Sequence, residues 1–529
     1  MASYDEVPYP SYAYAYTHPD IMATIATLMG LTTPRVETAR VLELGSAAGG
    51  NIIPMAVALP QATFLGIDYS AAEIAEGQAA LDVLRLPNIS LRHMDILDVT
   101  PELGIFDYII VHGVYSWVPK TVQTKILEIC RQNLAPNGVA YVSYNAYPGW
   151  HMLGAVRQMM LFHTRDITDP RMRAMQARSL VDFLVESVPT EGNAPGSLFG
   201  AYGHFLQHGI ERLKSNSDSY ILHDDLEEIN QPLYFYQFAE QATQHGLEYL
   251  AEADFATVFP NYFPPKVKEQ LLKMSRDVVE MEQYMDFLRV RTFRRTLLVH
   301  DGMLKSRSLK SERVLSLFMA SQAQPVSDQP DIGGVNVEQF RGGGGATLST
   351  DHPVSKAAMM VLAREWPGSL SFDELLDQAY DYLNTDAATR RARRAQDTLV
   401  LSANLLRSYT YSERLVELHS HRPSFLMKPS TAPVSSTWAR LQAEDADNVT
   451  NLRHERVNLD ALSRFVLRLL DGGHDRASLV AALTKPLLEG QLVMHSNGEA
   501  VAAADAAACL DSELEETLVH LSRAALLVA

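Results

Sequence analysis

The sequence predicts an α/β fold with a mostly parallel, doubly wound sheet, followed by smaller α+β modules of winged-helix type. Three observations lead to this prediction. Apolar runs alternate with amphipathic stretches between residues 40 and 145, a glycine-rich loop follows the first run, and the alternation stops near residue 301. Strands that alternate with helices are typical of a parallel sheet covered on both faces.

Five apolar runs predict buried strands at residues 41–45, 62–68, 89–95, 106–113 and 138–145. Amphipathic helices are predicted between them at residues 50–59, 71–85 and 121–134. In sheets of this kind, ligands bind beyond the carboxyl ends of the strands. The residues that follow each strand are therefore the first candidates for a functional site.

The loop "ELGSAAGGN" after the first strand contains Gly45, Gly49 and Gly50, which let the backbone turn and approach a ligand closely. It lacks the G-x-G-x-x-G spacing of a dinucleotide loop and the Lys-Ser/Thr ending of a phosphate loop. Glu43 stands just before the turn, where an acid repels phosphates and suits a cation or an amine.

Two further acids end the next strands. Asp68 can accept both hydroxyls of a ribose, and Asp95 can accept an adenine amino group. Singly, such residues are often turn formers or helix caps. Taken together and in this order, they predict a nucleoside cofactor. The residues expected to contact it are Glu43, Gly45, Ser46, Ala47, Gly49, Asn51, Asp68, Tyr69, Asp95, Ile96, His112 and Gly113.

This pattern resembles the class I S-adenosylmethionine-dependent methyltransferases. Their first motif is similar to "LELGSAAGG", and their ribose and adenine acids correspond to Asp68 and Asp95. The resemblance implies S-adenosylmethionine as the cofactor, whose sulfonium charge fits an acid better than a lysine.

A narrower resemblance involves "FDYIIVHGVYSWVP", "VAYVSYNAYPGWHMLG" and "PLYFYQFAEQATQHGLEYLAEADF". These stretches look like bacterial methyltransferases with a methyltransferase regulatory domain, a group that includes rickettsial protein-lysine methyltransferases acting on outer-membrane proteins. The resemblance covers most of the chain. It implies a protein substrate with exposed lysines, without naming the target.

A methyltransferase sheet of this class usually has seven strands. Residues 234–247 predict a helix, and residues 248–253 and 291–301 predict the two missing strands. We therefore assign residues 1–160 and 220–302 to the methyltransferase domain and 161–219 to a helical insertion serving as a lid or homodimer contact. An independent regulatory domain after residue 220 is the alternative. Residues 303–426 and 427–529 are expected to form two further modules.

Aromatic residues gather where the strands end and in the N-terminal segment. Expected acceptor-pocket residues are Tyr14, Tyr16, Tyr115, Trp117, Tyr147 and Trp150. Aromatic faces hold cationic groups, and an apolar pocket favours a neutral amine. Tyr144 and Asn145 are the expected catalytic residues, with the Asn145 carbonyl orienting an amine. The alternative is that these rings only pack the top of the sheet.

The stretch "YILHDDLEEINQPLYF" contains His223, Asp224 and Glu227. One interpretation is an acidic entrance that attracts a lysine, with His223 as a catalytic proton acceptor. The other is an acid-rich helix start stabilised by the helix dipole. A metal site is not expected, because no second histidine lies one helical turn away.

The second half predicts helices at residues 354–366, 372–383 and 390–406, and a pair of helices around the turn at Gly472 and Gly473. Four arginines between residues 390 and 394 are expected to be solvated rather than bound to nucleic acid. The stretches "HSH" (419–421) and "RHER" (453–456) lack partners at metal-ligand spacing, and we expect them at the surface.

The chain has 529 residues, a net charge of −18 and two cysteines. Few cysteines fit a reducing compartment, and neither a signal peptide nor a membrane span is recognisable, so a cytoplasmic protein is expected. The acidic charge disfavours nucleic acid and suits a basic partner, although it can simply aid solubility.

The sequence therefore predicts a methyltransferase acting on lysine side-chain amines of a protein. A small-molecule methyltransferase and a cofactor-binding scaffold without turnover remain as alternatives.

Overall fold

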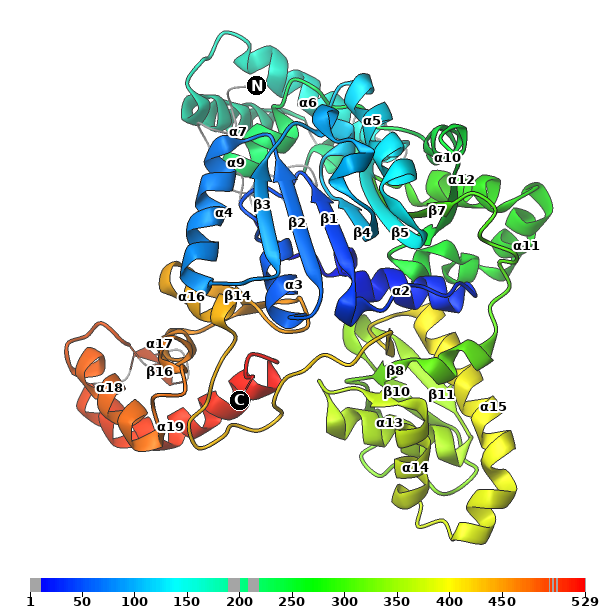
Figure 1. The fold of residues 1–529 in the computed structure, drawn as a ribbon, viewed down its shortest axis with the longest axis vertical. Helices are drawn as coiled ribbons and strands as arrows, with labels where there is room; N and C mark the ends of the chain where they lie inside the picture. The colour runs from blue at the N-terminus through cyan, green and yellow to red at the C-terminus, as the bar shows by residue number, and fades with distance from the viewer. Residues whose placement is uncertain are drawn as a thin grey trace.

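The computed structural model describes residues 11–188, 200–207, 218–493, 495–496, 499–500 and 503–528. A sheet domain forms the upper half of the molecule in Figure 1, and two smaller modules lie side by side beneath it. The middle module follows the sheet domain along the chain, and the C-terminal module comes last.

A seven-stranded sheet forms the sheet domain, in the order β3-β2-β1-β4-β5-β7-β6. Its strands are β1 (Arg40–Leu44), β2 (Thr63–Asp68), β3 (Ile89–His93), β4 (Phe106–Val111), β5 (Leu134–Asn145), β6 (Leu247–Glu252) and β7 (Phe293–His300). Strand β7 runs antiparallel to both of its neighbours, and the other neighbouring pairs are parallel. The predicted Rossmann-like sheet is thus confirmed, including the two strands expected after residue 220.

In the central strands of the sheet, alternating side chains enter separate cores on the two faces. Val41 and Tyr141 join one core, while their neighbours Leu42 and Val142 join the other. The first face is covered by α2 (Pro19–Leu28), α3 (Ile52–Ala58) and α4 (Ala71–Leu84), and the second by α5 (Lys120–Gln132) and α10 (Phe235–Gln244). Because both faces are covered, such strands are near-continuous apolar runs in the sequence, and this is why they were recognisable.

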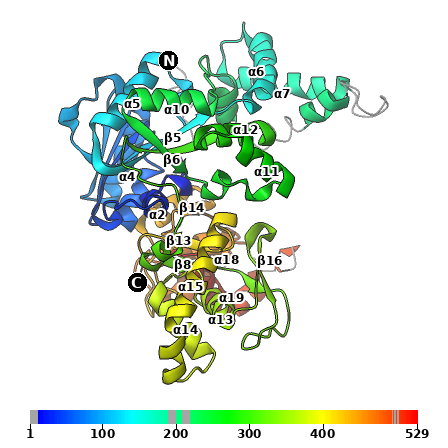
Figure 2. The ribbon, with the colours of Figure 1, turned by 90° about the vertical axis from the view of Figure 1, so that its right-hand side faces the viewer.

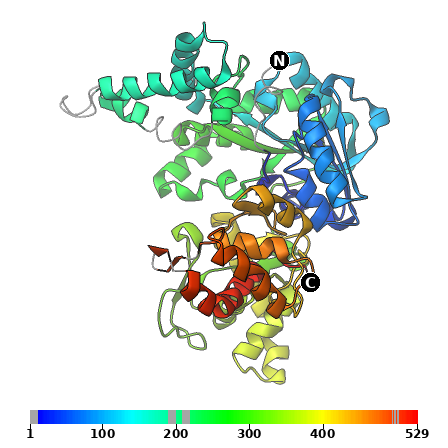
Figure 3. The same cartoon turned by 90° about the vertical axis from the view of Figure 1, so that its left-hand side faces the viewer.

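Two long helices, α6 (Gly149–Thr164) and α7 (Pro170–Ser187), project from the sheet domain (Figures 2 and 3). They pack on each other and on the turn at Ile221–Asp225 through a small core of their own. Helix α6 begins directly after the loop that follows β5 and crosses the expected boundary at residue 160. The short α9 (Asp218–Tyr220) precedes that turn, and α11 (Pro265–Met274) and α12 (Val278–Arg289) lie between β6 and β7.

The middle module contains two three-stranded sheets, ordered β12-β8-β13 and β11-β10-β9, with three helices. The strands are β8 (Phe318–Ala320), β9 (Gln324–Pro325), β10 (Glu338–Arg341), β11 (Thr347–Thr350), β12 (Leu370–Ser371) and β13 (Glu417–His419), and the helices are α13 (Pro353–Glu365), α14 (Phe372–Tyr382) and α15 (Ala387–Tyr411). On α15, Arg390 and Arg394 form ion pairs with aspartates of the preceding segment.

The C-terminal module has a separate core formed mainly by leucines of its helices. Its elements are α16 (Thr437–Asp445), β14 (Asn448–Thr450), β15 (Arg456–Asn458), α17 (Ala461–Leu469), α18 (Arg476–Leu488), β16 (His495–Ser496), β17 (Glu499–Ala500) and α19 (Ala503–Arg523). Helix α16 and strand β14 lie beneath α3, which brings this module against the sheet domain (Figure 1).

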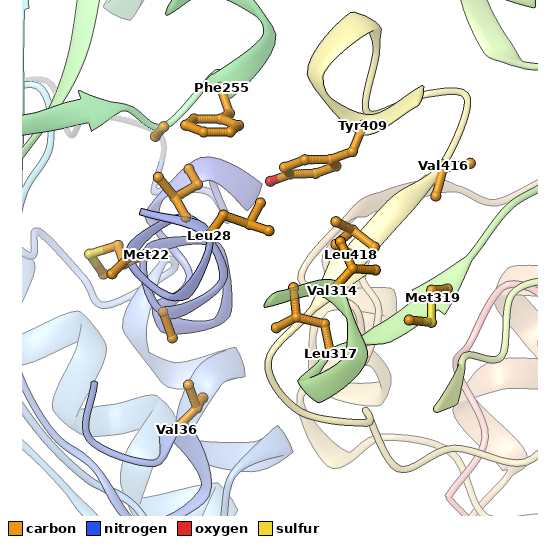
Figure 4. Close-up of a cluster of buried hydrophobic side chains, with 14 of the residues drawn as sticks. Met22, Leu28, Val36, Phe255, Val314, Leu317, Met319, Tyr409, Val416 and Leu418 are labelled. Atoms are coloured by element: carbon orange, nitrogen blue, oxygen red, sulfur yellow. The ribbon is translucent and has the colours of Figure 1, made fainter. Parts of the chain in front are cut away.

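Helix α2 joins the sheet domain to the middle module. Figure 4 shows Leu28 of α2 facing Val314, Leu317 and Leu418 of the middle module, with Phe255 of the sheet domain above the helix and Met22 on its opposite side. The rings of Phe255 and Tyr409 also meet, at 5.8 Å between centroids. Because one apolar core spans this junction, the two parts pack as one body rather than as separate domains on a flexible link.

The start of α2 also binds the "HSH" stretch, which the sequence analysis wrongly placed at the surface. Asp20 is buried and accepts hydrogen bonds from the Ser420 amide (2.6 Å), the Ser420 hydroxyl (2.7 Å) and His419 Nδ1 (2.7 Å). His421 is buried beside them. Local spacing could not reveal these partners, because they lie at the other end of the chain.

The His419–Asp20 pair predicts a pH dependence of stability. Burial lowers the pKa of His419, but the charge of Asp20 and hydrogen bonds to Asp20 and Glu417 raise it to about 9. A histidine whose folded pKa exceeds its ordinary value stabilises fully below pH 6.5, and this stabilisation is lost as pH rises to 9. The shift corresponds to about 3 kcal/mol at most.

The stability of His419→Gln should therefore depend less on pH between 6.5 and 9 than that of the natural protein. The melting midpoints of both proteins are measured across this pH range and subtracted at each pH. Titrating groups that the two proteins share contribute equally and drop out of this difference. Neighbouring His18 has its pKa lowered to about 3, by burial and by the His421 charge, and it costs stability only below pH 6.5. Parallel curves for the two proteins would contradict the charged pair.

Candidate cofactor and acceptor site

The polar residues predicted at strand ends lie along one edge of the sheet. In the order β3, β2, β1, β4 and β5, this edge carries Asp95, Asp68, Glu43, His112 and Asn145. Strand β1 has β2 on one side and β4 on the other, so the strand order reverses here. Loops diverge at such a reversal and leave room for a ligand.

Glu43 is buried at the end of β1. Its Oε1 accepts a hydrogen bond from Asn51 Nδ2 (2.6 Å), while Oε2 is buried and has no hydrogen-bond partner within the described residues. Burial raises the pKa of Glu43 to about 8, with the nearby charge of Asp68 adding to it. An unpaired buried carboxylate oxygen is costly, so it suits a ligand that brings a donor or a positive charge.

Asp68 holds the glycine loop. Its Oδ2 accepts from the Ala47 amide (2.8 Å) and its Oδ1 from the Ser70 amide (2.9 Å). Ala47 has φ 45°, an unfavourable angle for a residue with a side chain, and the Asp68 bond fixes it there. Gly45 (φ 76°) would meet Val114 if it carried a Cβ, so only glycine fits that close turn. Ser46 Oγ is buried without a partner in the described part of the chain.

The β3 end supplies Asp95, whose Oδ1 accepts from the Leu97 amide (2.9 Å). Asp95 and Ile96 are half-buried, and Tyr69 is exposed after β2 with its carbonyl 3.0 Å from His93 Nε2. The second carboxylate oxygen of Asp95 has capacity for a further donor. The β2 and β3 ends thus offer acceptors together with a large ring.

The N-terminal segment lies over the glycine loop, as the sequence analysis expected. Ser11 Oγ accepts from the Gly50 amide (2.7 Å), and the Tyr14 amide donates to Asn51 Oδ1 (3.0 Å). The Tyr14 ring stacks against His112 at 4.0 Å. Burial raises the pKa of Tyr14 to about 12, and the charges of Asp224 and Glu43 contribute to this shift.

His112 ends β4 beside Tyr14. Its Nδ1 lies 3.0 Å from the Tyr141 hydroxyl and 3.2 Å from Ser143 Oγ, which also accepts from the Gly113 amide (2.9 Å). Burial, together with the charge of Arg295, lowers the pKa of His112 to about 3. His112 is therefore neutral near pH 7 and provides a ring face without a charge.

Tyr115 and Tyr144 differ from the expectation of direct contact with an acceptor. Both are fully buried: Tyr115 donates to Gln241 Oε1 (3.0 Å), and Tyr144 stacks on Phe238 and lies 3.2 Å from Thr296 Oγ1. Burial raises the pKa of both hydroxyls. These positions argue for packing roles, so the packing alternative applies to these two rings.

Asn145 connects the β5 end to the chain that precedes α10. Its amide donates to Ser116 Oγ (2.8 Å), its Nδ2 donates to Asn230 Oδ1 (3.0 Å), and its carbonyl accepts from the Leu233 amide (3.0 Å). The first and third of these bonds hold the backbone of Asn145, and the bond to Asn230 holds its side-chain amide. Asn145 therefore has the rigid orientation that positioning an amine requires.

The aromatic loop after β5 divides into two parts. Trp150 packs edge-on against Trp117 at 6.1 Å, at the junction of the β4 and β5 loops. Tyr147 instead stacks on His151 at 4.0 Å and lies 5.3 Å from Tyr234. The Trp117–Trp150 pair and the Tyr147 cluster are thus different surfaces, and they do not form a single cage.

His223, Asp224 and Glu227 of the acidic stretch also lie in different surroundings. His223 is buried in the turn Ile221–Asp225, and Asp224 is half-buried near Tyr14. Glu227 is half-buried, and its carbonyl accepts from Arg157 of α6. The charge of Asp224 acts on Tyr14 at the cofactor edge.

Tyr16 does not face this edge, contrary to expectation. Its hydroxyl donates to Glu413 at the end of the middle module, and Arg295 covers its ring at 4.6 Å. Ser11 and Ser143 also hold this edge and were not predicted, because a serine gives no signal until its partner is known. A group of three or more histidine, cysteine or acidic side chains able to hold a metal is not found in the described ranges.

The acceptors along this edge fit S-adenosylmethionine. Its amine and sulfonium suit the unpaired Glu43 oxygen, and its ribose and adenine donors suit Asp68 and Asp95. A seven-stranded sheet with an antiparallel seventh strand and these acids defines a class I S-adenosylmethionine-dependent methyltransferase.

Comparison with known proteins agrees with this class. Residues 42–140 match the "methyltransferase domain" family, residues 217–300 the "predicted methyltransferase regulatory domain", and residues 432–526 the "PKMT, C-terminal winged helix domain". An uncharacterised protein of Rickettsia prowazekii, RP789, is 36% identical over 503 residues, covering 94% of this chain and 88% of that protein.

Solved structures of PKMT2 from Rickettsia typhi are similar along the whole chain. One has a TM-score of 0.85 at 29% identity, covering 98% of this chain and 100% of that one. Another, in complex with AdoHcy, has a TM-score of 0.83 at 29% identity, covering 99% and 100%. The chain therefore belongs to the methyltransferases of the rickettsial PKMT type, and S-adenosylmethionine is its cofactor.

Proposed function

We propose that this methyltransferase acts on lysine side-chain amines of a protein substrate. The observation that carries the proposal is the similarity to PKMT2 over the whole chain, including the modules beyond the sheet domain. A small acceptor does not require such modules, whereas a folded protein substrate can use them for docking. The net charge of −18 adds to this, because lysine-bearing surfaces are basic.

In this proposal Glu43, Asp68 and Asp95 hold the cofactor, and the β4 and β5 loops receive the acceptor. When bound, S-adenosylmethionine supplies a methyl group on a sulfonium sulfur. A lysine amine must be neutral to accept it, and the surroundings of Trp117 and Trp150 are apolar enough to lower the amine pKa. Asp224 is then the acid that attracts the cationic lysine before it loses its proton to solvent.

Two exposed surfaces support a large substrate or a second copy of the chain. Near Tyr147, the rings of Tyr236 and Phe287 are exposed and flank Tyr234. On helices α6 and α7, the large apolar side chains that are exposed are Met152, Phe162, Met172, Met175 and Phe183. Exposed apolar groups gathered in this way are typical of contact surfaces. The insertion fits the expected homodimer contact, and the domain limits given above remain our proposal.

An outer-membrane protein remains the proposed target. Within the described ranges, no helix is long and apolar enough to cross a bilayer.

The test is incubation with methyl-labelled cofactor, a bacterial lysate and its outer-membrane fraction, followed by mass spectrometry. Label on lysines of a protein would support the proposal. Label in small metabolites alone would favour a small-molecule methyltransferase. Tight cofactor binding without label on any fraction would favour a scaffold without turnover, and Asp68→Ala protein provides the background for each sample.

Asn145→Ala is expected to lower turnover roughly tenfold to a hundredfold while cofactor affinity stays nearly constant, since a lost positioning bond costs about 1–3 kcal/mol. Steady-state kinetics and calorimetry measure the two effects.

Asn230→Ala is the matched control, because it removes the same Asn145–Asn230 bond from the other side. Equal losses in the two variants would assign Asn145 a merely structural role. Tyr144→Phe, which loses only the hydroxyl near Thr296, should retain turnover.

A further inference from the structure

Within the "RHER" stretch, which was expected at the surface, the Arg453 side chain and His454 are buried at the junction of all three parts of the molecule, while Arg456 is exposed. The stretch forms the turn 451–455 between β14 and β15. Arg453 donates to Glu417 and to the Pro367 carbonyl (2.8 Å) of the middle module. His454 Nε2 lies 2.9 Å from Asn51 Oδ1 in the sheet domain.

Asn51 receives this contact directly behind the cofactor edge. Its Oδ1 accepts from the Tyr14 amide (3.0 Å) and lies 3.0 Å from Thr17 Oγ1, in addition to His454 Nε2. Its Nδ2 donates to Glu43 Oε1 (2.6 Å). Since Oδ1 can only accept, His454 must be the donor, and the three donors fix the amide so that Nδ2 points at Glu43.

The turn holds His454 in an unfavourable conformation. His454 has φ 62°, in the left-handed region, and only 4% of its surface is exposed. Asn451 Oδ1 accepts from the Arg453 and Glu455 amides (both 2.9 Å), and Asn451 Nδ2 donates to the Ala524 carbonyl (3.0 Å). Strain that the surroundings maintain in this way is often found where a side chain must be aimed.

His454 also stays uncharged. Burial lowers its pKa well below the ordinary value, and the charge of His18, whose ring lies 5.3 Å away, acts in the same direction. His18 and Asn51 face His454. Arg456, at the start of β15, covers the Tyr12 ring at 4.0 Å. The winged-helix domain therefore contacts the N-terminal segment at Tyr12 and His18 and the glycine loop through Asn51.

We propose that the C-terminal winged-helix domain completes the S-adenosylmethionine site, with His454 as a positioning residue that orients Asn51, and through it the Glu43 carboxylate and the segment Ser11–Thr17. The domain is then part of the cofactor site as well as an accessory module. Cofactor binding and docking of the domain become linked, because each stabilises the same arrangement of Asn51. The proposal rests on the assignment of Glu43 to the cofactor, and it goes beyond the choice of substrate.

The test compares His454→Ala with His454→Gln in the full chain. Glutamine carries an amide donor at the same reach as His454 Nε2, so it should restore most of what alanine loses. His474→Ala is the matched control, because His474 belongs to the same domain but pairs with Asp471 in a solvent-exposed turn. Calorimetry with S-adenosylhomocysteine measures affinity, and hydrogen exchange of the Tyr14 amide reports the N-terminal segment in cofactor-free protein.

We expect His454→Ala to weaken binding roughly fivefold to tenfold, the effect of one lost hydrogen bond. Tyr14 exchange should accelerate, and the KM for the cofactor should rise with kcat nearly unchanged. Unchanged affinity and exchange in His454→Ala would overturn the proposal, as would equal losses in the alanine and glutamine variants.

If His454→Ala unfolds the winged-helix domain, His454→Gly replaces it. Glycine also removes the hydrogen bond to Asn51 but adopts a φ of 62° without strain. Loss of affinity in a stably folded glycine variant supports the proposal, and retained affinity overturns it. Asp68→Ala separates this inference from the site assignment. If both Asp68→Ala and His454→Ala bind the cofactor normally, the assignment of the cofactor site is wrong. If only His454→Ala binds normally, the cofactor site stands and the proposed link to the winged-helix domain is wrong.

Discussion

Asp68→Ala is expected to weaken S-adenosylmethionine binding by about tenfold to more than a hundredfold. Hydrogen bonds to a charged group contribute roughly 1.5–3 kcal/mol, and each 1.4 kcal/mol is a factor of ten. Asp68 can accept ribose hydroxyls while its oxygens keep the Ala47 and Ser70 amides. Alanine would lose the ligand contact and also release Ala47 from its φ of 45°.

Calorimetric titration with S-adenosylmethionine measures the effect, and two variants show its origin. Asp68→Asn retains an oxygen for the Ala47 amide and should lose less affinity than alanine. Glu76→Ala removes an exposed carboxylate from the neighbouring helix α4 and should bind normally. If Asp68→Ala bound as tightly as the natural protein, our assignment of the ribose contact would be wrong.

The sheet and its polar edge could be predicted because both follow local rules. Strands β1, β2, β4 and β5 are apolar on both faces, and the glycine loop marks the turn into α3. Once the strands are parallel, their carboxyl ends must meet at one edge. Glu43, Asp68 and Asp95 could therefore be placed on a common edge without any knowledge of long-range contacts.

The position of each aromatic side chain could not be predicted in this way. A ring after a strand can face a ligand or pack beneath it, and the choice depends on residues far along the chain. Tyr115 and Tyr144 are buried because Phe238 of α10 packs against both. The Tyr16 side chain is held by Glu413, which accepts from its hydroxyl, and by Arg295, which covers its ring.

The buried histidines were missed for a related reason. Histidine is found both at surfaces and in interiors, and whether a given histidine is buried depends on a hydrogen-bond partner elsewhere in the chain. Asn51 and His454 are 403 positions apart. The spacing of these histidines was compared only with that of metal ligands. Their side chains instead form hydrogen bonds between modules, which sequence spacing does not reveal.

Arg294→Met is expected to destabilise the protein by about 3–5 kcal/mol, the usual cost of removing one partner from a buried ion pair. Arg294 lies on β7 with none of its surface exposed. Its guanidinium holds both oxygens of Asp286 (2.8 and 2.9 Å), Glu252 (2.8 Å) and Glu282 (3.0 Å), and it lies over the Phe235 ring at 3.7 Å. Methionine would leave three buried carboxylates beside the half-buried Arg291 alone.

The loss should be smaller in acid. Without Arg294, burial raises the pKa of these carboxyls, and an acid with a raised folded pKa stabilises the protein below that pKa and loses the effect as pH rises. Burial already raises the pKa of Glu282 to about 7 in the natural protein. The melting midpoint of Arg294→Met should therefore approach that of the natural protein near pH 6 and fall further behind it near pH 8.

Arg276→Met is the matched control, because Arg276 forms an exposed ion pair with Glu280 and its loss should change the midpoint little. Adding Asp286→Asn to Arg294→Met removes one uncompensated charge and should recover part of the stability at pH 8. The network also reaches the acceptor side of the sheet, since Glu252 accepts from Thr296 and Thr296 lies beside the Tyr144 hydroxyl. Equal losses at pH 6 and pH 8, with no recovery in the double variant, would show that packing against Phe235 rather than charge accounts for the role of Arg294.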